Sequence, residues 1–138
     1  MIGRLLDRLR HLSRQRRWKP ELASGRRGED LAHRFLQSKG YTIVARNYRL
    51  AAGDAETDLI AWDHGTLVFV EVKTRASAEF GPPERAFDGE KQRHMLRAAR
   101  QYAQRRNLSI EQVRFDLVTV ILQDPPQLEL FQGVKISR

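Results

Sequence analysis

The sequence predicts a single α/β domain in which a mixed β-sheet is flanked by helices. Two helical patterns alternate with strand-like segments: a helix, a strand, a β-hairpin, a second helix and further strands follow one another along the chain. With 138 residues the chain is long enough to bury a core, and because it has no cysteine, disulfides and thiolate metal sites are excluded. No apolar run is long enough to span a membrane and no secretory signal is visible, so we expect a cytoplasmic protein.

The first predicted helix covers about residues 25–39. Its apolar residues repeat at helical spacing: Leu31, Ala32, Phe35 and Leu36. Gly40 stands where a helix commonly ends. Glu29 shares the face of Ala32, so its side chain is expected to point inward. An alternative stays open, in which Glu29 and Asp30 only complement the positive end of the helix dipole.

A β-hairpin is predicted from residues 56–62 and 67–73, which are joined by the turn signal Asp-His-Gly-Thr. A two-residue or a four-residue loop gives the same register, in which Ile60 faces Phe69. Continuing away from the turn places Asp58 opposite Glu71, on the same side of the sheet. The same count places Glu56 opposite Lys73.

Asp58 and Glu71 are the core of the candidate site. Opposed residues in a sheet have Cβ atoms about 5 Å apart, so two carboxylates there need a cation between them. Mg²⁺ or Mn²⁺ with oxygen ligands suits this pair, and Lys73 can hold a water or a phosphoryl oxygen nearby. The valines on the other face of the second arm indicate a central, covered strand. The competing interpretation is a chance Glu-x-Lys salt pair, and the opposed Asp58 argues against it.

Several segments carry a family resemblance, and they are residues 25–29, 47–49, 56–61, 69–75 and 114–116. Together they resemble the bacterial YraN-like family over about residues 22–122. That family is similar to the PD-(D/E)xK nucleases, which include restriction endonucleases and archaeal Holliday-junction resolvases. The resemblance implies a restriction endonuclease-like fold. It also implies that Asp58 and Glu71 bind a divalent metal, that Lys73 assists the attacking water and that Glu29 completes the site.

The sequence departs from the usual pattern of that family just before Asp58. The family commonly has Gly-Glu-Ile-Asp, whereas this chain has Ala55, Glu56 and Thr57 in the preceding positions. Both acids are kept. The departures affect the bend that enters the strand and the packing on its opposite face, and a nuclease fold does not by itself establish nuclease activity.

The charge is concentrated in the N-terminal arm, which we assign to residues 1–21, ahead of an endonuclease-like domain at residues 22–138. The net charge of the whole chain is +8, and residues 1–27 carry most of the excess of Lys and Arg over acids. Apolar residues of the arm follow helical spacing, so a basic amphipathic helix is expected. Such an arm can track nucleic-acid phosphates, dock on an acidic partner, lie on an anionic membrane surface or remain a disordered tail.

After the hairpin, residues 77–83 form a loop with two prolines, which is expected to be a plain connection or to contact a substrate. A helix at about residues 88–106 follows, with one buried and one basic face. We expect Met95, Ala98, Ala99 and Tyr102 on its buried face. Lys91, near its start, is the basic residue expected to approach the site. The candidates for contact with nucleic-acid phosphates are Arg26, Arg27, Lys91 and Arg97.

Strand character returns at residues 113–122 and 128–131. Asp116 lies in the first of these segments, but an ion pair with its neighbour Arg114 excludes it from the predicted chemistry. The histidines at positions 11, 33, 64 and 94 lack the spacing of metal ligands, and we expect them at the surface or in turns.

The sequence therefore favours a metal-dependent endonuclease that uses Mg²⁺ or Mn²⁺ to cut DNA, with branched or irregular DNA as one option and a homodimer as a possible assembly. One alternative is a non-catalytic nucleic-acid-binding protein that keeps the nuclease fold. Another is a protein-interaction role for the amphipathic arm.

Overall fold

The computed structural model describes residues 20–50, 56–76 and 89–136. The predictions for the arm up to residue 19 and for the loop at residues 77–83 lie outside these ranges. The elements in chain order are α2 Pro20–Ser38, β1 Thr42–Arg49, β2 Glu56–Asp63, β3 Thr66–Arg75, α3 Gly89–Arg105, the 3₁₀ helix η2 Ile110–Gln112, β4 Val113–Ile121 and β5 Gln127–Phe131.

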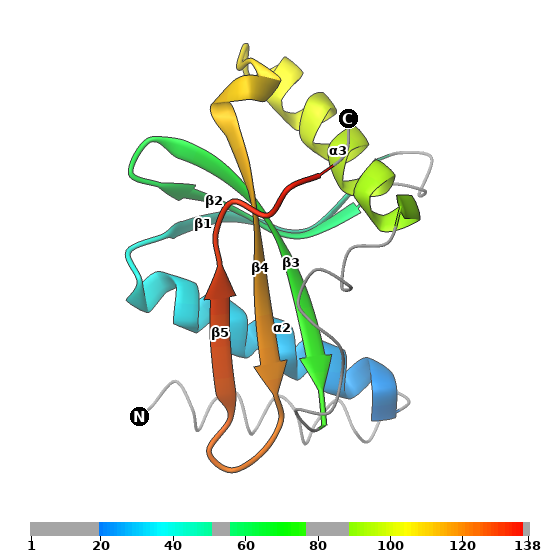
Figure 1. Ribbon diagram of the computed structural model, residues 1–138, viewed down its shortest axis with the longest axis vertical. Coiled ribbons are helices and arrows are strands. Elements are labelled where there is room, and N and C mark those ends of the chain that lie inside the picture. The colour runs from blue at the N-terminus through cyan, green and yellow to red at the C-terminus, as the bar shows by residue number, and fades with distance from the viewer. Residues whose placement is uncertain (1–19, 51–55, 77–88, 137–138) are drawn as a thin grey trace.

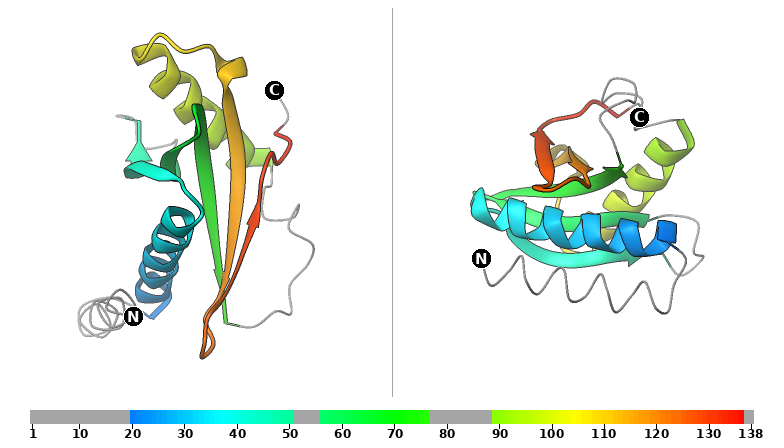
Figure 2. Two further views of the ribbon diagram at one scale, coloured as in Figure 1. Left: turned by 90° about the vertical axis from the view of Figure 1, so that its left-hand side faces the viewer. Right: turned by 90° about the horizontal axis from the view of Figure 1, so that it is seen from below.

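The five strands form one mixed sheet in the order β1-β2-β3-β4-β5 (Figure 1). Strands β3 and β4 pair in parallel and the other neighbouring pairs are antiparallel. The segment between β3 and β4 contains α3, and Figure 2 shows α2 running along the sheet. This architecture confirms the predicted mixed sheet flanked by helices and is consistent with a restriction endonuclease-like fold.

Each face of the sheet has its own apolar core. The core under α2 contains Leu31, Ala32, Leu36, Leu59, Ala61, Val68, Val70 and Val72 among its buried residues. The core under α3 contains Ile60, Leu67, Phe69, Met95, Leu96, Ala99, Tyr102, Phe115 and Leu117. Alternate residues of β2 and β3 enter the two cores, as the period of a strand requires. Strand β3 is thus central and covered on both faces, as its valines predicted.

The register of the hairpin agrees with the prediction. Ile60 pairs with Phe69, and the ladder closes at Asp63 and Thr66. The turn has two residues, His64 with a φ of 49° and Gly65 with a φ of 90°. Two consecutive positive φ values are what a tight hairpin of this twist needs, and glycine adopts them without steric cost.

Helix α2 begins at Pro20, earlier than predicted. Proline suits the first turn of a helix because its fixed φ is helical and it has no N–H to leave unpaired. Glu29 and Asp30 therefore lie well inside the helix, where the charge of the helix terminus has little influence. The helix-dipole alternative for these two acids was wrong, because it depended on the late start.

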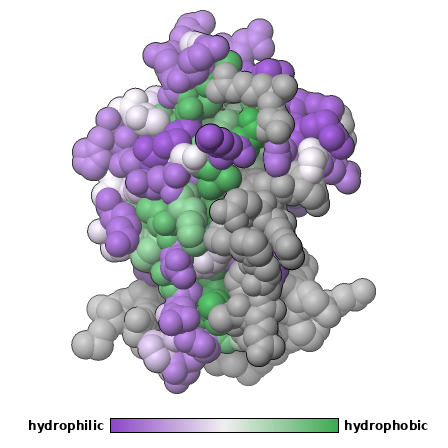
Figure 3. Space-filling view, in the orientation of Figure 1, coloured by the Kyte–Doolittle hydropathy of each residue, from purple (hydrophilic) through white to green (hydrophobic). Residues whose placement is uncertain are grey.

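Helix α3 buries the predicted residues Met95, Ala98, Ala99 and Tyr102. Its outer face carries the exposed side chains of Arg93, Arg97 and Arg100, and the surface over this helix is hydrophilic (Figure 3).

Candidate functional site

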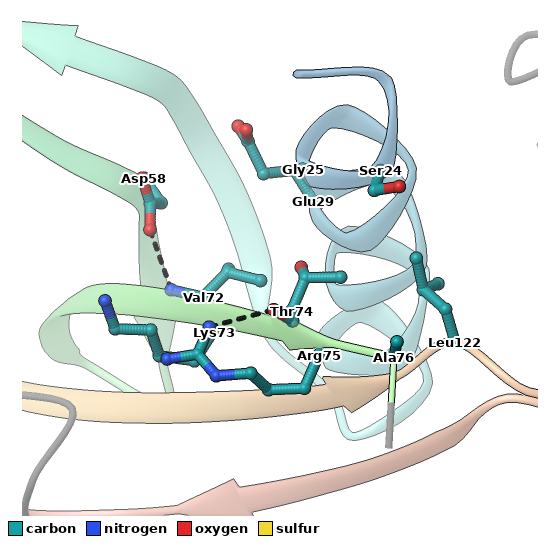
Figure 4. A pocket seen from close by; sticks show the side chains of 10 residues that line it. All are labelled: Ser24, Gly25, Glu29, Asp58, Val72, Lys73, Thr74, Arg75, Ala76 and Leu122. Atoms are coloured by element: carbon teal, nitrogen blue, oxygen red, sulfur yellow. Dashed lines mark hydrogen bonds between the residues drawn. The ribbon is translucent and has the colours of Figure 1, made fainter. Parts of the chain in front are cut away.

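Asp58 and Glu71 meet where β2 and β3 separate. The last pair of the β2–β3 ladder is Leu59 and Val70. Beyond that pair, the backbone N–H of Val72 donates to Oδ2 of Asp58 at 2.8 Å, and Figure 4 draws this bond. Val72 directly follows Glu71 in β3, and the negative charges of Asp58 and Glu71 repel each other. The two acids are therefore neighbours, but they are not the regular cross-strand pair that the register predicted, because the β2–β3 ladder does not extend beyond Leu59 and Val70. The bond from Val72 fixes the position of Asp58 where the two strands separate.

The two carboxyls lie in an environment that opposes their negative charge. Glu71 is only 3% exposed. Burial, and then repulsion from Asp58, raises the pKa of Glu71 to about 8, against the opposing charges of Lys91 and Lys73. Burial likewise raises the pKa of Asp58, although the bond from Val72 and the charge of Lys91 act in the other direction. A pair of this kind favours a bound proton or a bound cation.

Two lysines approach Glu71, one on each oxygen. Lys73 Nζ lies 4.0 Å from Oε1, and Lys91 Nζ lies 2.9 Å from Oε2. Lys73 belongs to β3, whereas Lys91 comes from the start of α3, as expected from its place in the sequence. Burial lowers the pKa of Lys91, but attraction to Glu71 and Asp58 is stronger in sum, and the net shift is upward. Lys91 is therefore a charged neighbour of the acid pair.

Glu29 approaches Asp58 from α2. Its side chain is 14% exposed, and the Arg26 guanidinium lies 3.8 Å from its Oε1. That oxygen is buried and accepts no hydrogen bond. Burial, and then the charge of Asp58, raises the pKa of Glu29, while Arg26, Arg46 and a hydrogen bond with Asn47 oppose the shift. Glu29 thus points inward, as its position in the sequence predicted.

A pocket of about 710 Å³ opens between α2 and the end of β3. Figure 4 shows its lining: Ser24, Gly25, Glu29, Asp58, Val72, Lys73, Thr74, Arg75, Ala76 and Leu122. Glu29 reaches Asp58 from the α2 side of the sheet, and Glu71 contacts Lys91 on the α3 side. In the described part of the chain, no three His, Cys, Asp or Glu side chains form a group that could hold a metal ion. The candidate metal ligands are therefore the neighbouring carboxyls of Asp58 and Glu71, with Glu29 approaching from α2.

Residues 28–120 match the model of the uncharacterised protein family UPF0102. The chain belongs to this family. A UPF0102 protein of Solibacter usitatus (strain Ellin6076) is 55% identical over 133 residues, which cover 96% of this chain and 98% of that protein. A UPF0102 protein of Koribacter versatilis (strain Ellin345) is 44% identical over 113 residues, which cover 81% of this chain and 78% of that protein.

A third relative, a UPF0102 protein of Persephonella marina (strain DSM 14350 / EX-H1), is 40% identical over 97 residues that cover 70% of this chain and 82% of that protein. The matched range of the family model includes Glu29, Asp58, Glu71, Lys73 and Lys91. Among the described residues of this UPF0102 chain, no helix is long and apolar enough to cross a bilayer.

One predicted contact of this UPF0102 chain was wrong. Glu56 was expected opposite Lys73, but it pairs with Arg49 of β1, and the Arg49 Nε lies 3.1 Å from Glu56 Oε2. The reason is that β2 pairs with β3 only from Leu59 onward, whereas the start of the strand, at Glu56 and Thr57, pairs with β1 alone. Glu56 still contributes to the electrostatics of the site, because its charge acts on Lys91.

The role of Gly28 was not recognised from the sequence. A Cβ atom at this position would overlap the hydroxyl of Thr74, so only glycine lets α2 approach β3 this closely. The same close approach carries the neighbouring Glu29 toward Asp58. A glycine inside a predicted helix was the available signal, since glycine there usually has a packing reason.

Asp116 lies in a separate polar network, as predicted. Arg114 Nε donates to its Oδ1 at 2.9 Å, the Tyr41 hydroxyl donates to its Oδ2 at 2.7 Å, and the Gly133 N–H donates to its Oδ1 at 3.0 Å. Arg114 Nη2 also lies 2.7 Å from Asp63 Oδ2, beside the hairpin turn. This network ties together segments that are distant in the sequence.

The histidines are placed as follows. His64 is exposed in the hairpin turn, as predicted. His33 and His94 are partly exposed on α2 and α3. His11 lies outside the described residues.

Proposed function

We propose that this UPF0102 protein is a metal-dependent endonuclease that cuts a DNA phosphodiester by attack of water. The observation that carries the proposal is the adjacency of two carboxyls, the half-buried Asp58 and the buried Glu71, whose pKa values are both raised. Buried titratable groups that are perturbed by each other and placed beside a pocket are typical of functional sites.

The donor set fits Mg²⁺ or Mn²⁺. These ions are commonly bound by one or two carboxylates, with water and substrate oxygens completing the coordination, so a pair suffices where a group of three is absent. Asp58 and Glu71 would hold the ion, and Glu29, whose Oε1 accepts no hydrogen bond, would assist from the α2 side. When bound, such an ion offsets phosphate charge and makes a coordinated water more acidic.

The residues of the chain itself have separate tasks in this proposal. The Val72 N–H holds the Asp58 carboxylate in one orientation. Lys73 is 28% exposed beside the pocket, where its ammonium can donate to the attacking water or to a phosphoryl oxygen. Arg26 and Arg27 on α2, with Lys91 and Arg97 on α3, would contact the phosphate backbone.

The test is a cleavage assay on linear duplexes, flaps and four-way junctions, with Mg²⁺ or Mn²⁺ and with EDTA. We expect cleavage that needs the metal and falls by about 100-fold or more in Asp58→Asn and in Glu71→Gln. Glu129→Gln is the matched control, because this exposed residue of β5 loses the same charge away from the pair. Metal-dependent cleavage at the wild-type rate in both site variants would refute the proposal. A dimer with two sites would cut both strands of a junction.

A non-catalytic nucleic-acid-binding role is the second candidate, and the exposed arginines of α3 favour it. In that case DNA binding falls steeply with salt, survives Asp58→Asn and is mostly lost when residues 1–20 are removed. Binding that is unaffected by this truncation would contradict it. If the arm instead docks on a protein, capture of a partner will depend on Leu5, Leu6 and Leu9 and not on DNA.

A further inference from the structure

Lys91 occupies an unusual position for a residue at the start of a helix. Its Nζ lies 2.9 Å from Glu71 Oε2, and its side chain is only 20% exposed. The charges of Asp58 and Glu56 also attract it, which raises the pKa of Lys91 further. The other lysine of the site, Lys73, lies farther from Glu71, at 4.0 Å.

Two adjacent carboxylates, one of them buried, need a positive charge, and among the described residues Lys91 has the ammonium nearest to Glu71. The carboxylate oxygen that it contacts is one of the oxygens that a divalent cation would use. An ammonium and a divalent cation cannot share that position without strong repulsion, since the two positive charges would lie only a few ångströms apart.

We propose that Lys91 is the resident counter-ion of the Asp58–Glu71 pair and competes with a divalent cation for it. This inference rests on the proposed function, because it assumes that the pair is a metal site. Loading of the metal then requires Lys91 to withdraw from Glu71, which couples the occupancy of the site to the position of the first turn of α3. The displaced ammonium is left beside the site, where a substrate phosphate can accept its hydrogen bonds.

The test measures Mn²⁺ binding to the full chain at pH 8.0, by electron paramagnetic resonance of the free ion. Lys91→Met should bind Mn²⁺ about tenfold more tightly than the wild type. The repulsion between a unit charge and a divalent ion a few ångströms away exceeds the free energy of a tenfold change in affinity, even at a high effective dielectric constant. Lys91→Arg, which keeps the charge, should bind with wild-type affinity. Arg93→Met is the matched control, since it removes one exposed charge from the same helix and should leave the affinity unchanged.

Thermal unfolding gives a second readout. In EDTA, Lys91→Met should melt below the wild type, and Mn²⁺ should raise its midpoint more than that of the wild type. If the variant does not fold in EDTA, folding on addition of Mn²⁺ supports the proposal, and failure to fold with Mn²⁺ overturns it. Equal or weaker Mn²⁺ binding by Lys91→Met also overturns it.

The outcomes separate this inference from the proposed function. If the wild type cleaves DNA with Mn²⁺ but Lys91→Met binds Mn²⁺ no more tightly, the endonuclease proposal is supported. The proposal that Lys91 competes with the metal is then refuted. Tighter Mn²⁺ binding by Lys91→Met in a protein that cuts no DNA would support the counter-ion role and refute the endonuclease.

Discussion

Glu71 and Asp116 are both buried acids on neighbouring central strands, yet their surroundings differ. Asp116 is fully buried and accepts from Arg114, Tyr41 and Gly133. Glu71 has another carboxyl, Asp58, as a neighbour and relies on lysine charges. A buried acid whose hydrogen bonds are complete stabilises the fold, whereas one placed beside another acid costs stability and is typical of a site that binds something. The predictions below test this difference, beginning with the largest effect.

Asp116→Asn should lower the free energy of unfolding by about 3 kcal/mol or more, because it leaves the charge of Arg114 without its buried partner. Urea unfolding followed by circular dichroism measures the change. Glu129→Gln on the exposed surface is the control and should change the free energy by no more than about 0.5 kcal/mol. A small loss in Asp116→Asn would mean that the network is not structural.

Gly28→Ala should lower the free energy of unfolding by about 2 kcal/mol, because the added methyl overlaps Thr74. Gly25→Ala, in the same helix, meets no atom within 4 Å and should stabilise by up to about 1 kcal/mol through helix propensity. The same urea experiment compares them. Equal effects would show that α2 does not depend on its close approach to β3, and that the position of Glu29 needs another explanation.

Glu71→Gln should leave the metal-free protein as stable as the wild type or more stable by about 1 kcal/mol at pH 8, since it removes the repulsion within the acid pair. The sign is opposite to that of Asp116→Asn. Urea unfolding in EDTA measures it, and a loss as large as that of Asp116→Asn would erase the distinction between the two acids.

The two regions should also respond to pH in opposite directions. The pKa of Glu71 is raised from 4.5 to about 8 in the folded protein, so the folded state binds more protons than the unfolded state between these values. The stability of the metal-free protein should therefore fall as pH rises from about 5 to 8, and Glu71→Gln should flatten this limb.

The effect of Asp63 on the pH dependence of stability is opposite to that of Glu71, because the hydrogen bond from Arg114 lowers the pKa of Asp63. Its contribution is present above the pKa of an unfolded aspartate and is lost as pH falls below it. Asp63→Asn should flatten the acid limb only. Unfolding curves measured in EDTA over a pH series give the slope of the free energy of unfolding against pH. The same slope in Glu71→Gln and Asp63→Asn would contradict the opposite roles of the two acids.

Much of the fold was predictable because it is encoded by local periodicity. The register of the hairpin followed from its turn, and the buried face of α3 followed from helical spacing. These two features were enough to predict that Asp58 lies near Glu71 and that Lys91 approaches the site. The start of α2 was missed because proline is a helix breaker in most positions and a helix former in the first turn.

The contacts that were not predicted lie between segments that are distant in the sequence and that no common hydrophobic periodicity links. The ion pair of Arg46 with Asp30 depends on how β1 passes α2. The residues of β2 before Leu59 do not pair with β3, and there the side chain of Asp58 accepts from the backbone N–H of Val72, which no register rule includes. Such features arise from tertiary packing, and one sequence does not encode them locally.

The two-residue turn at His64 and Gly65 limits how this gene can vary in length. One additional codon between Asp63 and Thr66 would shift the pairing of the hairpin by a residue or force a bulge, and a shift would rotate Asp58 away from Glu71 to the other side of the sheet. Insertions that spare the acid pair must therefore keep this register, as a four-residue loop or a bulge would, or fall outside the hairpin.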